Sequence, residues 1–162
     1  MSKKIIVVGV GDMKLSKDPD SVVATYSLGS CIGLVVYDPE VKVGGILHYM
    51  LPNSKIDGES TTRPFMFANT GIPILFREIY KMGAKKSRLI VKAAGGSTIM
   101  DDRGIFGIGK KNYMALKDIF ARNNVNMKGE NVGGNISRTI YLNIRSGEVV
   151  IKTSGEKQDI LL

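Results

Sequence analysis

Residues 27–52, SLGSCIGLVVYDPEVKVGGILHYMLP, decide the fold, because the apolar runs on either side of Asp-Pro-Glu-Val predict an antiparallel hairpin. We expect strands over residues 32–37 and 43–51, with Pro39 and Glu40 at the centre of a two-residue turn. In that register Cys31 lies directly opposite His48. Opposed Cβ atoms are roughly 4.5–5.5 Å apart, so the only cysteine and the only histidine of the chain would meet.

A thiol beside an imidazole is the minimal arrangement of an activated nucleophile. The register depends on the turn, and Pro39 favours a type I turn, whereas two-residue hairpins prefer the mirror-image types. A longer loop would shift the pairing by one or two residues, and a one-residue slip would put the pair on opposite faces. The alternative interpretation is structural: Cys31 as a small buried apolar residue and His48 as a residue of the core.

The length of 162 residues predicts a single domain over 1–162. One cysteine excludes an intramolecular disulfide, and one histidine beside it excludes a Cys/His zinc cluster. No carboxylate cluster has ligand spacing, so we expect no metal, and attack by a thiol activated by an imidazole needs no organic cofactor. The apolar run after Met1 is short and ends at Asp12, and nothing approaches the roughly 20 apolar residues of a membrane span. We therefore expect a cytoplasmic protein without membrane insertion.

The net charge of +8 raises the hypothesis of a nucleic-acid or membrane partner. The basic residues are scattered in short groups, such as Lys110-Lys111, and no zinc-finger spacing or aromatic RNA-binding motif occurs. Solvated surface charge is the favoured interpretation, with an acidic protein partner next and no nucleic acid.

The rest of the chain alternates apolar strands with two amphipathic segments. Helix 69–82 would carry Pro73 in its first turn and end at Gly83; if it began near Pro64, Pro73 would kink it. The polar loop 52–62 would either gate a site near His48 or be a plain solvent loop. The other expected elements are strands 5–10, 22–28 and 88–94, helix 111–123, and a hairpin of 138–144 with 149–152. This order predicts an α+β fold with mixed, mostly antiparallel sheets and two main helices.

Glycine-rich turns recur beside the apolar strands. The sequence GVGD at 9–12 lacks the rest of a dinucleotide fingerprint, so a structural turn is favoured. The others are Gly29-Ser30, Gly95-Gly96-Ser97 and Gly133-Gly134-Asn135. Ordinary turns explain each one, but converging strand ends would bring their N–H groups to one cleft. We therefore expect the backbone of Gly29 and Ser30, just before Cys31, to help form an oxyanion hole.

A Cys–His pair usually has a third group that holds the imidazole. No Asp or Asn lies beside His48 on its strand, but Thr25 and Ser27 share one face parity on the preceding strand. A threonine hydroxyl can accept a hydrogen bond, although it stabilises imidazolium less than a carboxylate would. A catalyst of moderate power is therefore expected, with Ser27 as a candidate substrate contact.

Several motifs resemble the CheD family of chemoreceptor glutamine deamidases. They are TYSLGSCIG at 25–33, HYMLP at 48–52, KMGA at 81–84, KAAGGS at 92–97, IGKKN at 108–112 and VGGNISR at 132–138. The resemblance implies a cysteine-dependent amidohydrolase that converts glutamines of methyl-accepting chemotaxis receptors to glutamates. It also implies Cys31 as nucleophile, His48 as general base and acid, and Thr25 as third member. Its implied fold is a layered α/β domain similar to cysteine deamidase toxins.

The resemblance further implies a CheC-like CheY-phosphate phosphatase as partner. Attack of Cys31 on a glutamine carboxamide would give a thioester intermediate. The same thioester would form from a glutamyl methyl ester, so receptor methylesterase side activity is expected too. The sequence departs from the family pattern at Asn69 and Asn131, where aspartate is common, and at Ser137, where glycine is usual. The alternative function is a non-catalytic chemotaxis adaptor that binds receptors or a CheC-like phosphatase.

Overall fold

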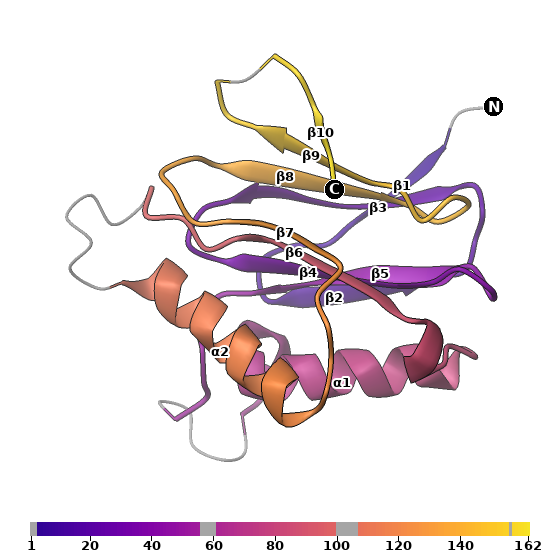
Figure 1. Cartoon of the computed structure of the whole chain (residues 1–162), viewed down its shortest axis with the longest axis horizontal. Helices are drawn as coiled ribbons and strands as arrows, with labels where there is room; N and C mark the ends of the chain where they lie inside the picture. The colour runs from indigo at the N-terminus through magenta and orange to yellow at the C-terminus, as the bar shows by residue number, and fades with distance from the viewer. Residues whose placement is uncertain (1–2, 56–60, 100–106, 156) are drawn as a thin grey trace.

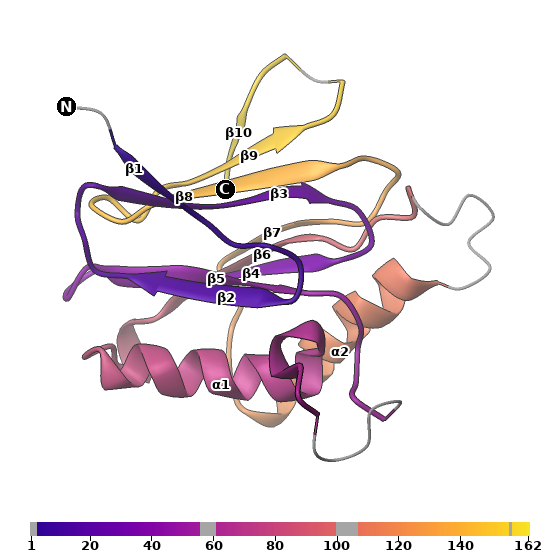
Figure 2. The same ribbon diagram turned by 180° about the vertical axis from the view of Figure 1, so that it is seen from behind.

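Two five-stranded sheets lie face to face in the computed structural model, and two helices cover the outer face of one of them (Figures 1 and 2). The structure describes residues 3–55, 61–99, 107–155 and 157–162. The first sheet has the order β1-β3-β8-β9-β10 and the second β2-β5-β4-β6-β7. Only the pairs β1–β3 and β6–β7 are parallel among the described strands. The predicted α+β fold is thus confirmed.

The strands of the first sheet are β1 Lys4–Val7, β3 Ser21–Leu28, β8 Arg138–Asn143, β9 Val149–Thr153 and β10 Ile160–Leu161. Those of the second are β2 Asp12–Ser16, β4 Ile32–Asp38, β5 Val43–Tyr49, β6 Ile90–Gly95 and β7 Gly129–Val132. The helices are α1 Ala68–Lys81 and α2 Ile108–Arg122, with short 3-10 helices at Pro64–Met66 and Lys86–Arg88. The sequence did not predict β2, β7 or β10.

The β4–β5 hairpin exists, but its predicted register is wrong by two residues. Asp38 pairs with Val43 and not with Val41, so Gly33 lies opposite His48. The buried carboxylate of Asp38 accepts hydrogen bonds from the backbone of Glu40 and Lys85 and from the Arg88 guanidinium. These contacts stabilise a longer loop than the predicted two-residue turn. Because side chains alternate with period two, the shift keeps every residue on its predicted face.

Helix α1 begins at Ala68, after a separate 3-10 turn at Pro64–Met66, so it does not start near Pro64. Pro73 lies inside the helix, beyond the first turn in which the other prediction had placed it. Gly83 ends the helix as predicted, with φ +100° and its N–H on Tyr80 O. The predicted loop 52–62 lies partly outside the described residues. Hydrogen bonds fix the first part of this loop to α1. Ser54 is buried, its backbone N–H donates to Asn69 Oδ1, and its hydroxyl accepts from Asn69 Nδ2.

The second sheet has an apolar core on both faces. One face packs on α1 and α2 through residues such as Leu34, Leu47 and Leu116. The other packs on the first sheet through residues such as Val35, Ile46 and Ile140. Every residue of β4 and β5 is therefore buried. No helix in the described part of the chain is long and apolar enough to cross a membrane.

Candidate active site

A hydrogen bond between the two sheets holds the only histidine. His48 on β5 and Thr25 on β3 are both buried, and Thr25 Oγ1 lies 2.7 Å from His48 Nδ1. The same hydroxyl donates to the carbonyl oxygen of Val8 at 2.8 Å. Since its one proton points to Val8, the hydroxyl must accept from His48. This fixes the tautomer: Nδ1 carries the proton and Nε2 has the free lone pair.

Burial sets the charge of this imidazole. It lowers the pKa of His48 from 6.5 to about 4, because the charged ring loses its hydration between the sheets. Nε2 is buried and has no hydrogen-bond partner among the described residues. An unprotonated, unpartnered nitrogen is the form that a general base requires.

Cys31 comes immediately before β4 and packs against the same apolar cluster between the sheets. Its thiol is half-buried, and burial raises its pKa, an effect that its own backbone N–H partly offsets. No hydrogen bond joins the thiol to His48 Nε2. The prediction that the two residues are directly opposed is wrong: Gly33 pairs with His48, so Cys31, two residues before Gly33, lies diagonal to His48.

Gly33 occupies the position opposite His48, where the sheets approach closely. A Cβ atom there would lie 2.5 Å from Ile140 Cδ1 and 3.0 Å from Leu28 Cδ1. The next nearest atom is Cγ2 of Thr25. The absence of a side chain therefore lets the two sheets close around the Thr25–His48 bond.

The loop before Cys31 presents unused backbone donors. The N–H groups of Gly29 and Ser30 donate to no acceptor in the described part of the chain. The carbonyl groups of the same loop are held: Gly96 N–H donates to Cys31 O at 2.8 Å, and Ser97 N–H to Gly29 O at 2.9 Å. A loop fixed by its carbonyls, with free N–H groups beside a thiol, fits the predicted oxyanion hole.

The three glycine turns do converge on this end of the sheets. The Gly133 N–H donates to Gly95 O, and the Thr98 N–H to Gly134 O. Arg138 lies buried between these turns and donates to the carbonyls of Gly95 and Gly133 and to Asn131 Oδ1. The pKa of Arg138 is lowered by burial. This arginine thus positions the turn that holds Cys31 O, a role the sequence did not predict.

Asn112, also missed, connects both segments of the candidate site. Its buried side-chain amide on α2 donates to Ser30 O and to Met50 O, at 2.9 Å each. Ser30 precedes Cys31, and Met50 lies two residues after His48. A signal was present in the sequence, because Asn112 lies one helical turn before Leu116, on the apolar stripe of α2.

Ser27 does not share the face of Thr25, so that expectation is wrong. A bulge interrupts β3 between Thr25 and Leu28. Ser27 sits in it with φ +56°, and its side chain is exposed. Thr25 points inward to His48, whereas Ser27 lies at the surface.

Comparisons with known proteins show which proteins this chain resembles. The family model described as CheD chemotactic sensory transduction matches residues 50–153. The chain is 48% identical over 151 residues to the probable chemoreceptor glutamine deamidase CheD 1 of Syntrophus aciditrophicus, covering 93% of this chain and 94% of that one. It is 46% identical over 157 residues to the probable chemoreceptor glutamine deamidase CheD of Solibacter usitatus, covering 96% and 93%.

Among solved structures, Neisseria meningitidis protein NMB0706 is similar over 82% of this chain and 63% of that one, with a TM-score of 0.44 and 11% identity, too weak a likeness to support an inference. The family match and the relatives, by contrast, extend over most of the sequence. This chain belongs to the CheD family.

Proposed function

We propose that this protein deamidates glutamine side chains of chemotaxis receptors, with Cys31 as nucleophile, His48 as general base and acid, and Thr25 as the group that orients His48. One observation carries the chemistry: the Thr25–His48 bond leaves Nε2 unprotonated between the two sheets, where Cys31 also packs. The receptor substrate comes from the relatives, which are named chemoreceptor glutamine deamidases.

In the proposed reaction the Cys31 thiol and the His48 imidazole are both uncharged before the substrate is attacked. Because the pKa of the thiol is raised and that of His48 is lowered, both groups are neutral at rest, and the proton passes from Sγ to Nε2 only as sulfur attacks the carboxamide carbon. The N–H groups of Gly29 and Ser30 stabilise the oxyanion. The imidazolium returns its proton to the leaving nitrogen, so ammonia departs and a thioester remains. Water, deprotonated by the same nitrogen, then releases glutamate and the thiol.

The test is incubation of a receptor cytoplasmic fragment with the protein, followed by mass spectrometry and an ammonia assay. We expect a gain of one mass unit at particular glutamines and one ammonia for each. Cys31→Ala and Cys31→Ser should abolish both signals while circular dichroism and the melting temperature show an intact fold. Ammonia release by Cys31→Ala would refute the mechanism, and receptor binding without any mass change would indicate an adaptor.

The same chemistry would hydrolyse a glutamyl methyl ester, which we propose as a side activity of the site. Methanol release from methylated receptor should then disappear in the same Cys31→Ala variant. A CheC-like phosphatase is proposed as a second partner on the family resemblance alone, and co-elution of the two purified proteins would test it.

A further inference from the structure

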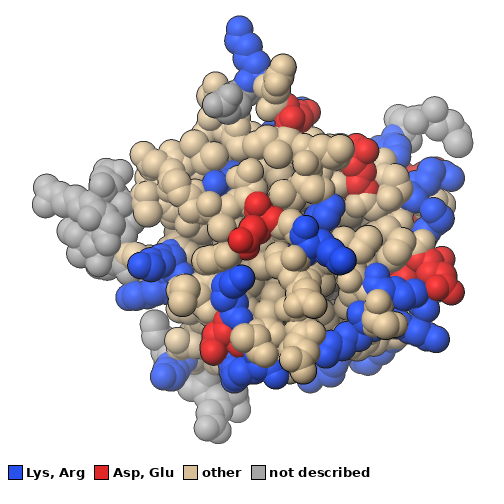
Figure 3. All heavy atoms as spheres, viewed as in Figure 1, with Lys and Arg blue, Asp and Glu red and all other residues tan. Residues whose placement is uncertain are grey.

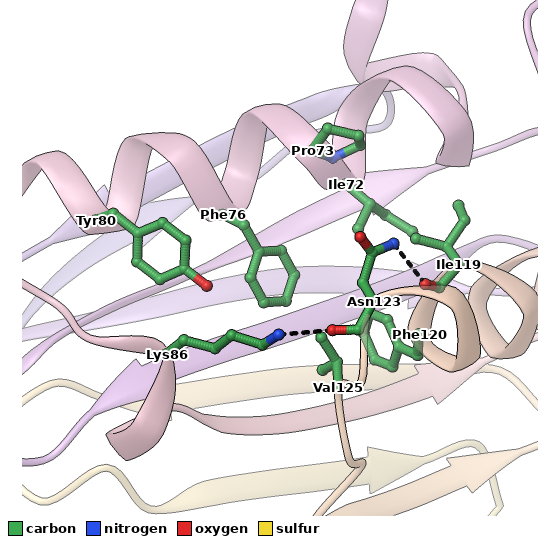
Figure 4. Close-up of a pocket in the computed structure, with 9 residues that line it drawn as sticks. All are labelled: Ile72, Pro73, Phe76, Tyr80, Lys86, Ile119, Phe120, Asn123 and Val125. Carbon is green, nitrogen blue, oxygen red and sulfur yellow. Dashed lines mark hydrogen bonds between the residues drawn. The ribbon is translucent and has the colours of Figure 1, made fainter.

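A groove between α1 and α2 is a second feature of the surface, separate from Cys31. Its central hollow, of about 300 Å³, is lined by Ile72, Phe76 and Tyr80 of α1, by Phe120 of α2, and by Val125 and Lys86 (Figure 4). Two further hollows adjoin it, because one shares Phe76, Lys86 and Val125 with it and the other shares Phe120 and Val125. We call these three hollows together the helix groove.

Apolar side chains line the helix groove in a regular row. Ile72, Phe76 and Tyr80 follow one another at every fourth residue, so they are about 6 Å apart along α1. The ring of Phe76 meets those of Tyr80 and Phe120 edge-on, at centroid distances of 6.3 and 6.0 Å. Tyr80 remains 37% exposed. A partner helix repeats its own apolar residues at the same interval, so it would match this row.

The charges around the helix groove have one sign. Its charged lining residues are Lys86, Lys117 and Lys128, and no Asp or Glu is among the described residues that line it. The side chain of Lys86 is fixed, since its Nζ donates to Asn123 O at 2.6 Å (Figure 4).

The helical layer around the groove is more basic than the chain as a whole. Helices α1 and α2 and the 3-10 helix Lys86–Arg88 contain eight Lys and Arg against two acidic residues, whereas the full chain has 23 against 15. In Figure 3, Lys and Arg side chains outnumber Asp and Glu over the part of the view where the helices lie. The two acidic residues, Glu78 and Asp118, are each paired with a neighbour on their own helix. The layer therefore favours an acidic partner.

We propose that the helix groove is an exosite that binds an acidic amphipathic helix of the receptor substrate, an inference that rests on the proposed function. Apolar residues of that helix would fill the hollow between Phe76, Tyr80 and Phe120, and its carboxylates would pair with the three lysines. Both helices begin at the end of the sheets that carries the catalytic residues. Asn112 contacts Ser30 there, and Phe120 lies eight residues further along α2, about 12 Å away. One receptor helix can thus engage both places.

The test compares groove variants with matched variants elsewhere. Lys117→Glu/Lys128→Glu is matched by Lys17→Glu/Lys152→Glu, which changes the net charge equally outside the helical layer. Tyr80→Ala is matched by Met114→Ala, which removes an exposed apolar side chain of α2 that does not line the groove. For each protein, binding of the receptor cytoplasmic fragment is measured at low and high salt. Steady-state deamidation is measured on the fragment and on a short glutamine peptide.

The groove variants should weaken fragment binding and raise the KM for the fragment at least tenfold, without a matching change for the short peptide. The matched variants should resemble the original protein. Unchanged fragment binding by both groove variants would overturn the exosite. It would also be overturned if the groove variants lost binding to anionic phosphatidylserine vesicles and not to the receptor fragment. If the original protein binds the fragment but releases no ammonia, the proposed function fails, while the binding comparison still decides the exosite.

Discussion

At the scale of single residues, burial moves the pKa values of Cys31 and His48 in opposite directions. The pKa of the thiol is raised and that of the imidazole is lowered to about 4, so both groups are uncharged near neutral pH. We therefore predict that the rate of Cys31 alkylation by iodoacetamide rises steadily with pH, up to and beyond the ordinary thiol pKa of about 8.5. His48→Gln should leave this profile nearly unchanged. A rate plateau below pH 7 that is lost in His48→Gln would show instead a resting thiolate–imidazolium pair.

The Thr25 hydroxyl has a role that a matched pair of variants can isolate. Thr25→Val keeps the shape but removes the hydroxyl, so Val8 O and His48 Nδ1 lose their partner. Since the imidazole can then turn or change tautomer, we expect kcat to fall roughly 100-fold, at the low end of what acid–base groups contribute.

Thr25→Ser keeps the hydroxyl and should recover most of the rate. The measurement is kcat for ammonia release, with the melting temperature as a check on the fold. Equal loss in the serine and valine variants would mean that the threonine methyl group, and not its hydroxyl, matters.

At the scale of elements, Asn112 ties α2 to both strands that carry the candidate site. Asn112→Ala removes two hydrogen bonds, to the carbonyls of Ser30 and Met50, at a cost of about 1–3 kcal/mol of stability. Because the segment before Cys31 and the end of β5 then lose their common support, we expect kcat to fall at least tenfold while KM changes little. A loss of stability with kcat unchanged would limit Asn112 to a structural role.

The hairpin shows how far the sequence determines such elements. The apolar runs and the turn at Asp-Pro-Glu-Val sufficed to predict both strands and the face on which Cys31 and His48 lie. The predicted register was wrong because contacts distant in sequence determine it. The Asp38 carboxylate accepts hydrogen bonds from the Lys85 backbone and the Arg88 side chain, which both follow α1 in the chain. Lys42 also adopts φ +53°, which its residue type does not signal.

Other errors have similar causes. The alternation of β3 predicted Ser27 beside Thr25, but the bulge follows from pairing with β8, more than a hundred residues away. Strand β2 is short and partly polar and owes its conformation to its ladder with β5. Thr25 was placed on the correct face, because the pairing of β3 with β8 is regular up to Thr25.

At the scale of the whole molecule, the stacking of the two sheets buries the residue that the chemistry needs neutral. His48 is 1% exposed, and its hydrogen-bond partner belongs to the other sheet. The unfolded chain binds a proton at this histidine below pH 6.5, whereas the folded protein resists protonation down to about pH 4. The unfolded state therefore holds more protons in this window, and stability must fall as the pH falls.

The loss of stability at low pH that His48 causes can be predicted and measured on the whole protein. His48→Gln removes the titrating group, so its free energy of unfolding should decline less between pH 7 and pH 4 than that of the original protein. A pKa difference from 6.5 to about 4 corresponds to about 3 kcal/mol when fully expressed. Urea unfolding of both proteins at several pH values measures the difference in slope, and the carboxylates common to both cancel. Parallel stability curves would mean that His48 titrates alike in the folded and unfolded states, and that the sheets do not hold it neutral.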